Sequence, residues 1–188
     1  MDANAGGHRG HGAVKIQIPP TTHHRGRNSR LNIPVLTAFV LLALGVGAVG
    51  AMFSPGFSPA AMQWYSGLAK PGWLPPPNWF GPIWVVLYVL MGTAAYMVSR
   101  ERYHRAHMAA MSAYVVQLLL NGFWAPLFFG MHNVGAGLFD IVALLMALGW
   151  TVREFARVRA GAAFLLLPYL IWVCVAVAMN WSLWKLNP

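Results

Sequence analysis

Charged residues are scarce in this sequence, and acidic residues are the scarcest of all. Only 9% of the 188 residues are charged, against roughly a quarter in soluble domains. The four acidic residues form no carboxylate pair, and neither a nucleophile with its base nor a cluster with metal-ligand spacing is visible. The residues alone therefore predict no catalytic group, no metal site and no required cofactor.

Cysteine is almost absent, because Cys174 is the only one. It cannot form a disulfide within the chain, and it leaves the redox compartment open. The alternating pattern of a membrane β-barrel is also missing, since the apolar residues form continuous runs. Helices satisfy their own backbone hydrogen bonds in lipid, so a helical membrane protein is predicted.

Hydrophobic residues make up 58% of the chain and gather in runs of about twenty residues, the length that crosses a hydrocarbon core about 30 Å thick. The five runs are residues 33–53, 82–99, 108–129, 134–152 and 162–184. We therefore predict an all-α membrane protein in which residues 31–188 form a five-transmembrane-helix bundle. Residues 54–81, rich in Pro and Trp, are predicted to form a lid loop.

Basic residues are distributed unequally between the two ends of the predicted spans. Apart from Lys70 and Lys185, all 13 Lys and Arg residues lie in residues 1–30 or after the second and fourth runs. The positive-inside rule then places the N-terminus in the cytoplasm if the chain inserts into a bacterial cell membrane. Residues 1–30 read as a disordered basic tail. Nucleic acid is not an expected partner, because the basic residues flank membrane helices. Membrane lipid is an expected partner.

Tryptophans concentrate at the opposite, outer end. Of the nine tryptophans, only Trp172, near mid-membrane, and Trp150, toward the cytoplasm, lie elsewhere. An aromatic belt would occupy both interfaces. The excess at one end therefore predicts an aromatic lid over a site held among the helices.

Polar residues inside the runs extend this hypothesis, because a polar group in lipid normally faces the bundle interior. They form two helical stripes, Tyr114, Gln117, Asn121 and Trp124 on the third run and Tyr169, Trp172, Ala176 and Asn180 on the fifth. On the second run Trp84 and Tyr88 lie one turn apart, and Asp140 is the only acid inside any run. Aromatic walls with a few polar groups indicate a site for a flat, mostly apolar ligand. The alternative is that the amides bridge helices and Asp140 is structural.

Four segments resemble the translocator protein family, also called tryptophan-rich sensory proteins or peripheral benzodiazepine receptors. They are WYSGLAKPGWLPPPNWFGPIWVVLYVLMG from Trp64, QLLLNGFWAPLFFG from Gln117, PYLIWVCVAVAMNWSLW from Pro168, and the weaker GLFD from Gly137. The resemblance covers about residues 33–188 and implies a five-helix bundle, usually a homodimer.

The resemblance also implies a function and a set of ligand contacts. It implies a membrane receptor or sensor that binds porphyrins, such as protoporphyrin IX and haem, and benzodiazepine-type ligands. The implied contacts are Trp64, Tyr65, Trp84, Asn121, Trp124, Trp172, Ala176 and Asn180, to which the polar pattern adds Tyr88 and Asp140. Two alternatives stay open. One is light- and oxygen-dependent porphyrin breakdown, with Trp84 and Trp172 as the implicated pair, and the other is transport of a porphyrin or a sterol.

Overall fold

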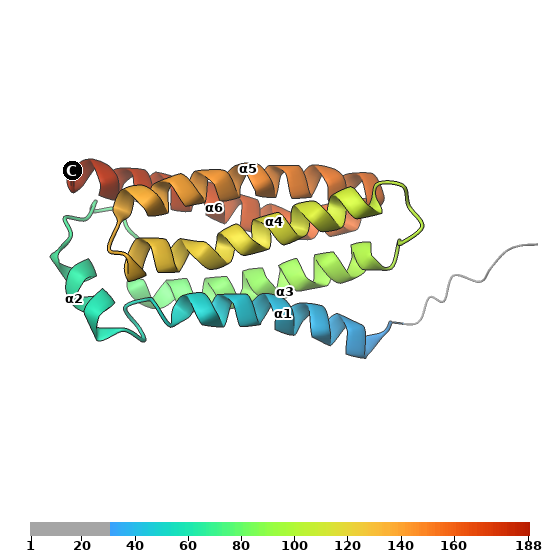
Figure 1. Cartoon of the computed structure of the whole chain (residues 1–188), viewed down its shortest axis with the longest axis horizontal. Coiled ribbons are helices and arrows are strands. Elements are labelled where there is room, and N and C mark those ends of the chain that lie inside the picture. The colour runs from blue at the N-terminus through green and yellow to red at the C-terminus, as the bar shows by residue number, and fades with distance from the viewer. Residues whose placement is uncertain (1–30) are drawn as a thin grey trace, which may run out of the picture. The chain divides into compact units, whose positions relative to one another are not determined.

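The computed structural model describes residues 31–188, which are mostly helical (Figure 1). The predicted disordered tail, residues 1–30, lies outside the described residues. In chain order the elements are α1 (Ile33–Ala51), α2 (Pro59–Gly67), the 3-10 turn η1 (Pro77–Trp79), α3 (Phe80–Ser99), α4 (His107–Ala125), the π-helical turn η2 (Pro126–Gly130), α5 (Val134–Val158) and α6 (Ala160–Leu186).

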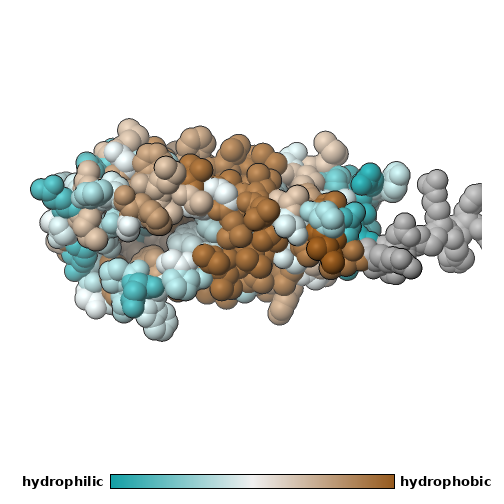
Figure 2. Space-filling model, turned by 90° about the horizontal axis from the view of Figure 1, so that it is seen from below, coloured by the Kyte–Doolittle hydropathy of each residue, from teal (hydrophilic) through white to brown (hydrophobic). Residues whose placement is uncertain are grey.

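Five helical segments within residues 31–188 are long and apolar enough to cross a membrane. They are α1, α3 with η1, α4 with η2, α5 and α6. The all-α class and the five-span bundle are thereby confirmed. On the face shown in Figure 2, apolar side chains dominate the middle and polar side chains gather toward the ends, as expected of a bundle surrounded by lipid.

Three helices begin at side chains that cap their free backbone N–H groups. In each case a side-chain oxygen accepts a hydrogen bond from the backbone N–H three residues later. The capping residues are Asn32 for α1, at 3.3 Å, Ser58 for α2, at 3.3 Å, and Asn133 for α5, at 2.9 Å. Proline also stands in the first turn of α1 and α2, where its missing N–H costs nothing. Local chemistry therefore fixes where these helices start.

The segment predicted as a lid loop, residues 54–81, is partly helical. It contains α2 and η1, joined by a stretch that includes Pro71, a turn at residues 72–73 and Pro75. The cap at Ser58 and the proline at position 59 explain why a short helix forms here. Likewise α5 continues past residue 152 to Val158, because its last turns still bury Glu154 and Phe155 against the bundle.

The helices pack so that α5 contacts both α4 and α6, while α3 contacts α1 and α6. The approach of α3 to α1 depends on Gly92, because a Cβ added there would lie 2.6 Å from the Cα of Val40. Helix α2 lies across the end of the bundle where α4 ends and α5 begins (Figure 1). That end carries the aromatic residues described next.

Candidate functional site

A chain of side-chain hydrogen bonds joins three helices inside the bundle. The Tyr88 hydroxyl on α3 donates to Oδ1 of Asn121 on α4 at 2.5 Å, and Nδ2 of Asn121 donates to the Tyr169 hydroxyl on α6 at 2.7 Å. All three residues are buried. Asn121 thus uses both ends of its amide to bridge two tyrosines, which is the helix-bridging role that the sequence left open as the alternative.

Two tryptophans flank this bridge through different partners. Trp84 stacks on Tyr88, with ring centroids 5.6 Å apart and planes at 29°, and meets Tyr169 edge-on at 6.1 Å. Trp172 meets Phe80 edge-on at 5.8 Å. Both indoles are half-buried. Trp84 therefore belongs to the wall of the Asn121 bridge, whereas Trp172 packs toward the first turn of α3.

A second aromatic cluster joins α2 to the end of α4 and to η2. Trp124 stacks on Phe128 at 5.1 Å, and Trp64 of α2 meets Phe128 edge-on at 5.4 Å. Tyr65 meets Phe129 edge-on at 5.6 Å. We call these five residues the lid cluster. Phe128 and Phe129 were not among the predicted ligand contacts, although the aromatic run after Trp124 was a visible signal.

Trp124 connects the lid cluster to α6. Its indole Nε1 donates to Oδ1 of Asn180 at 3.4 Å, and Nδ2 of Asn180 donates to the Ala176 carbonyl at 2.9 Å. Asn180 and Ala176 are buried. Three of the predicted contacts are therefore joined directly by hydrogen bonds.

Asp140 is buried on α5, and its Oδ2 has no hydrogen-bond partner within residues 31–188. The Tyr114 hydroxyl and Oε1 of Gln117 are also buried without a hydrogen-bond partner in this part of the chain. Buried polar atoms are normally paired, so the interior keeps polar capacity that its own side chains do not use. A ligand with polar edges, or ordered water, would satisfy it.

The segment after α2 is tied to the C-terminal end of α6. Asn187 accepts from the Ala69 N–H at 2.9 Å and donates to the Ala69 carbonyl at 3.0 Å. The Lys70 ammonium lies 4.6 Å from the centroid of the Tyr65 ring, and burial raises the pKa of the Tyr65 phenol. Asn187 was not singled out from the sequence, because a polar residue near a chain end carries no pattern.

An open cavity of about 330 Å³ borders the lid cluster at this end. Trp64, Leu68, His132, Trp184 and Asn187 are among the residues that line it. The His132 ring stacks on Trp64 at 5.0 Å, and its backbone has a φ of 52°, a conformation that non-glycine residues seldom adopt. The volume is at the lower end of the range for small-molecule sites.

Comparison with known proteins places this arrangement in a family. A sequence profile described as TspO/MBR family matches residues 39–185. The chain belongs to the TspO/MBR family. The matched range contains all ten predicted ligand contacts, from Trp64 to Asn180.

Several curated relatives match over most of their own length. The chain is 39% identical to the tryptophan-rich protein TspO of Chlorobaculum tepidum over 83% of this chain and 98% of that protein. It is 35% identical to the protein CrtK of Rhodobacter capsulatus, over 84% and 96% respectively. It is 36% identical to the human translocator protein, over 74% and 82%.

Family membership and the five apolar spans together identify an integral, multi-pass membrane protein. In this TspO/MBR protein six of the ten predicted contacts fall into two neighbouring groups. Trp84, Tyr88 and Asn121 belong to the bridge, and Trp64, Tyr65 and Trp124 belong to the lid cluster. Trp172 and Asp140 lie on α6 and α5, with no ring contact or hydrogen bond to either group among those found in residues 31–188.

Proposed function

We propose that this protein is a membrane receptor or sensor that binds a planar, mostly apolar ligand between the Asn121 bridge and the lid cluster. The observation that carries the proposal is the gathering of indole, phenol and carboxamide groups from α3, α4 and α6 beneath α2. Aromatic walls with a few directed polar groups suit such a ligand. Relatives named tryptophan-rich sensory protein and translocator protein support a sensing or ligand-binding role.

Porphyrins, protoporphyrin IX and haem, are the ligands that we propose first, with benzodiazepine-type molecules as smaller competitors. The tetrapyrrole plane would replace an internal stacking contact such as Trp84 on Tyr88. The carboxylates of the porphyrin would meet cations at the α2 end of the bundle, where Lys70 lies over Tyr65 and Lys185 lies over Trp181. Charge-assisted hydrogen bonds of this kind are about twice as strong as neutral ones.

A ligand between the bridge and the lid cluster requires α2 to move, because Trp64 and Tyr65 of α2 already contact the aromatic rings of η2 at the end of α4. The contacts of Trp64 and Tyr65 with Phe128 and Phe129 are edge contacts, each worth about 0.5–1.5 kcal/mol beyond burial. The lid is therefore held by a few contacts of modest strength. A large flat ligand that offers its own aromatic surface would compensate for their loss.

Titration of the purified protein in detergent micelles with protoporphyrin IX tests the proposal, with the porphyrin's own fluorescence as the signal. We expect Trp84→Phe, in the wall of the bridge, and Trp124→Phe, in the lid cluster, to weaken binding by about two- to tenfold, the value of one aromatic contact. The matched control is Trp150→Phe, since Trp150 is exposed and lies toward the basic end, away from the proposed site, and this variant should bind like the wild type. Equal affinities in all three variants would refute the proposed site.

We also propose that the protein is a homodimer in a bacterial cell membrane, with its N-terminus in the cytoplasm. Helix α1 leaves Leu41, Leu42 and Val49 exposed, so a second copy or lipid must cover this face. Orientation follows from the basic residues at the end opposite α2. Mass measurement in native detergent complexes and labelling of single cysteines from each side of the membrane would check these two statements.

A further inference from the structure

The end of the bundle opposite α2 carries an excess of positive charge. Two segments there, the connection at residues 100–106 and residues 153–159 at the end of α5, contain six arginines and two glutamates, a formal net charge of +4. Both segments lie at the same end of the bundle (Figure 1), where apolar spans give way to polar surface. Clusters of this kind attract anionic lipid headgroups. Charge alone, however, describes a diffuse attraction and no site.

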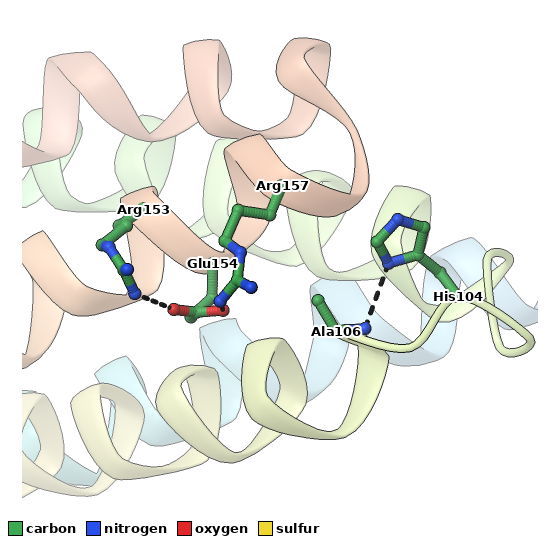
Figure 3. Close-up of polar contacts among 5 residues, drawn as sticks. All are labelled: His104, Ala106, Arg153, Glu154 and Arg157. Atoms are coloured by element: carbon green, nitrogen blue, oxygen red, sulfur yellow. Dashed lines mark hydrogen bonds and ion pairs between the residues drawn. The ribbon is translucent and has the colours of Figure 1, made fainter.

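A buried carboxylate organises two of these arginines. Glu154 is 2% exposed and accepts from Arg153 at 2.5 Å and from Arg157 at 2.8 Å, as Figure 3 shows. The two arginine side chains are themselves 69% and 51% exposed. Each guanidinium has five N–H donors, so donors remain that face outward. Two guanidinium groups are thus held on one carboxylate.

The surface of α5 below these arginines is apolar and exposed. Met146 is 67% exposed and Trp150 is 42% exposed, and with Arg153 and Arg157 they follow the spacing of one helical face. Along this face the apolar side chains of Met146 and Trp150 lie toward mid-membrane, and the two arginines follow them at the membrane–water interface. Trp150 is also the tryptophan that stands apart from all the others, toward the basic end.

We infer that Met146, Trp150, Arg153 and Arg157 form a binding site for one anionic phospholipid, with Glu154 as the residue that positions the two arginines. The acyl chain lies along Met146 and Trp150, and the phosphate accepts hydrogen bonds from both guanidinium groups. Arginine suits this role because its planar donors match phosphate oxygens in pairs. The inference is independent of the proposed porphyrin site, which lies at the other end of the bundle.

Binding is measured by native mass spectrometry of the full chain in detergent, titrated with phosphatidylglycerol or phosphatidylcholine of the same acyl chains. We expect tighter binding of phosphatidylglycerol, and a loss of that affinity of about tenfold or more for Arg153→Gln and for Arg157→Gln, the effect of removing a hydrogen bond to a charged group. The matched control is Arg102→Gln, an exposed arginine at the same end, which should lose less than twofold. Equal losses in the three variants would replace the site by diffuse attraction.

Glu154→Gln separates the two explanations most sharply. This substitution removes one negative charge from the basic end, which raises the net charge there by one, so diffuse attraction predicts tighter binding of phosphatidylglycerol. The site predicts weaker binding, because the two arginines are no longer held together. Trp150→Ala, which changes no charge, should also weaken binding, and circular dichroism shows whether either variant is folded. Tighter binding by Glu154→Gln, an unchanged Trp150→Ala, or equal binding of glycerol phosphate without acyl chains would overturn the inference.

Discussion

Replacing Asn121 by leucine should destabilise the bundle by removing the bridge between α3 and α6. The substitution leaves the Tyr88 hydroxyl without its acceptor and the Tyr169 hydroxyl without its donor, both in buried positions. Each side-chain hydrogen bond between membrane helices is worth about 0.6–2 kcal/mol. We therefore expect the free energy of unfolding to fall by about 1–4 kcal/mol for the two bonds together.

The measurement is reversible unfolding in mixed micelles with increasing sodium dodecyl sulfate, followed by circular dichroism. Ser112→Leu is the matched control, because Ser112 is an exposed polar residue on the same helix and its replacement should not lower stability. A loss in Ser112→Leu as large as in Asn121→Leu would show that any leucine at a polar position of α4 has this effect.

A double-mutant cycle with Tyr88→Phe tests whether the bridge itself is responsible. In the Asn121→Leu background the Tyr88 hydroxyl has already lost its partner, so its removal should cost little or even help. We expect a coupling energy of about 0.5–2 kcal/mol, as for residues that share one network. Additive losses would mean that Asn121 and Tyr88 act separately, and the hydrogen bond between them would then contribute nothing to stability.

Three further predictions concern packing, the lid and pH. Gly92→Ala should lower the thermal midpoint, with a cost of about 1–3 kcal/mol for overpacking, because the added Cβ meets the α1 backbone. The control Gly149→Ala, whose added Cβ meets nothing within 4 Å, should be neutral or slightly stabilising. A larger loss of stability in Gly149→Ala than in Gly92→Ala would contradict the helix contact. Asn187→Ala should speed hydrogen exchange around Ala69, at a cost of about 0.5–1.5 kcal/mol per lost bond, and unchanged exchange would show that the contact does not hold the lid. Burial raises the pKa of the Tyr65 phenol above the ordinary value of 10.0, so the unfolded chain releases this proton first. The stability contributed by the neutral phenol is complete below pH 10 and decreases as pH rises through the raised pKa; a spectrophotometric titration against Tyr65→Phe should find this phenol ionising later than a free tyrosine.

The sequence by itself determined the membrane class, the number of spans and the end at which the aromatic residues gather. These follow from run lengths and composition, which depend on the thickness of the bilayer and not on how the helices pack. The helical stripe of α4 also identified Asn121 and Gln117 as residues facing the interior, and both are buried. Periodicity fixes which side of a helix is buried because each side chain advances by a known angle.

Only the tertiary structure decided which buried groups meet. Periodicity says nothing about the rotation and depth of one helix relative to another, so it could not show that Asn121 bridges Tyr88 and Tyr169 or that Trp172 packs on Phe80. The position of α2 against the π-helical turn at Pro126–Gly130 also depends on contacts with distant residues. Those contacts bring Phe128 and Phe129 under the lid, and they arise only when the five spans pack together.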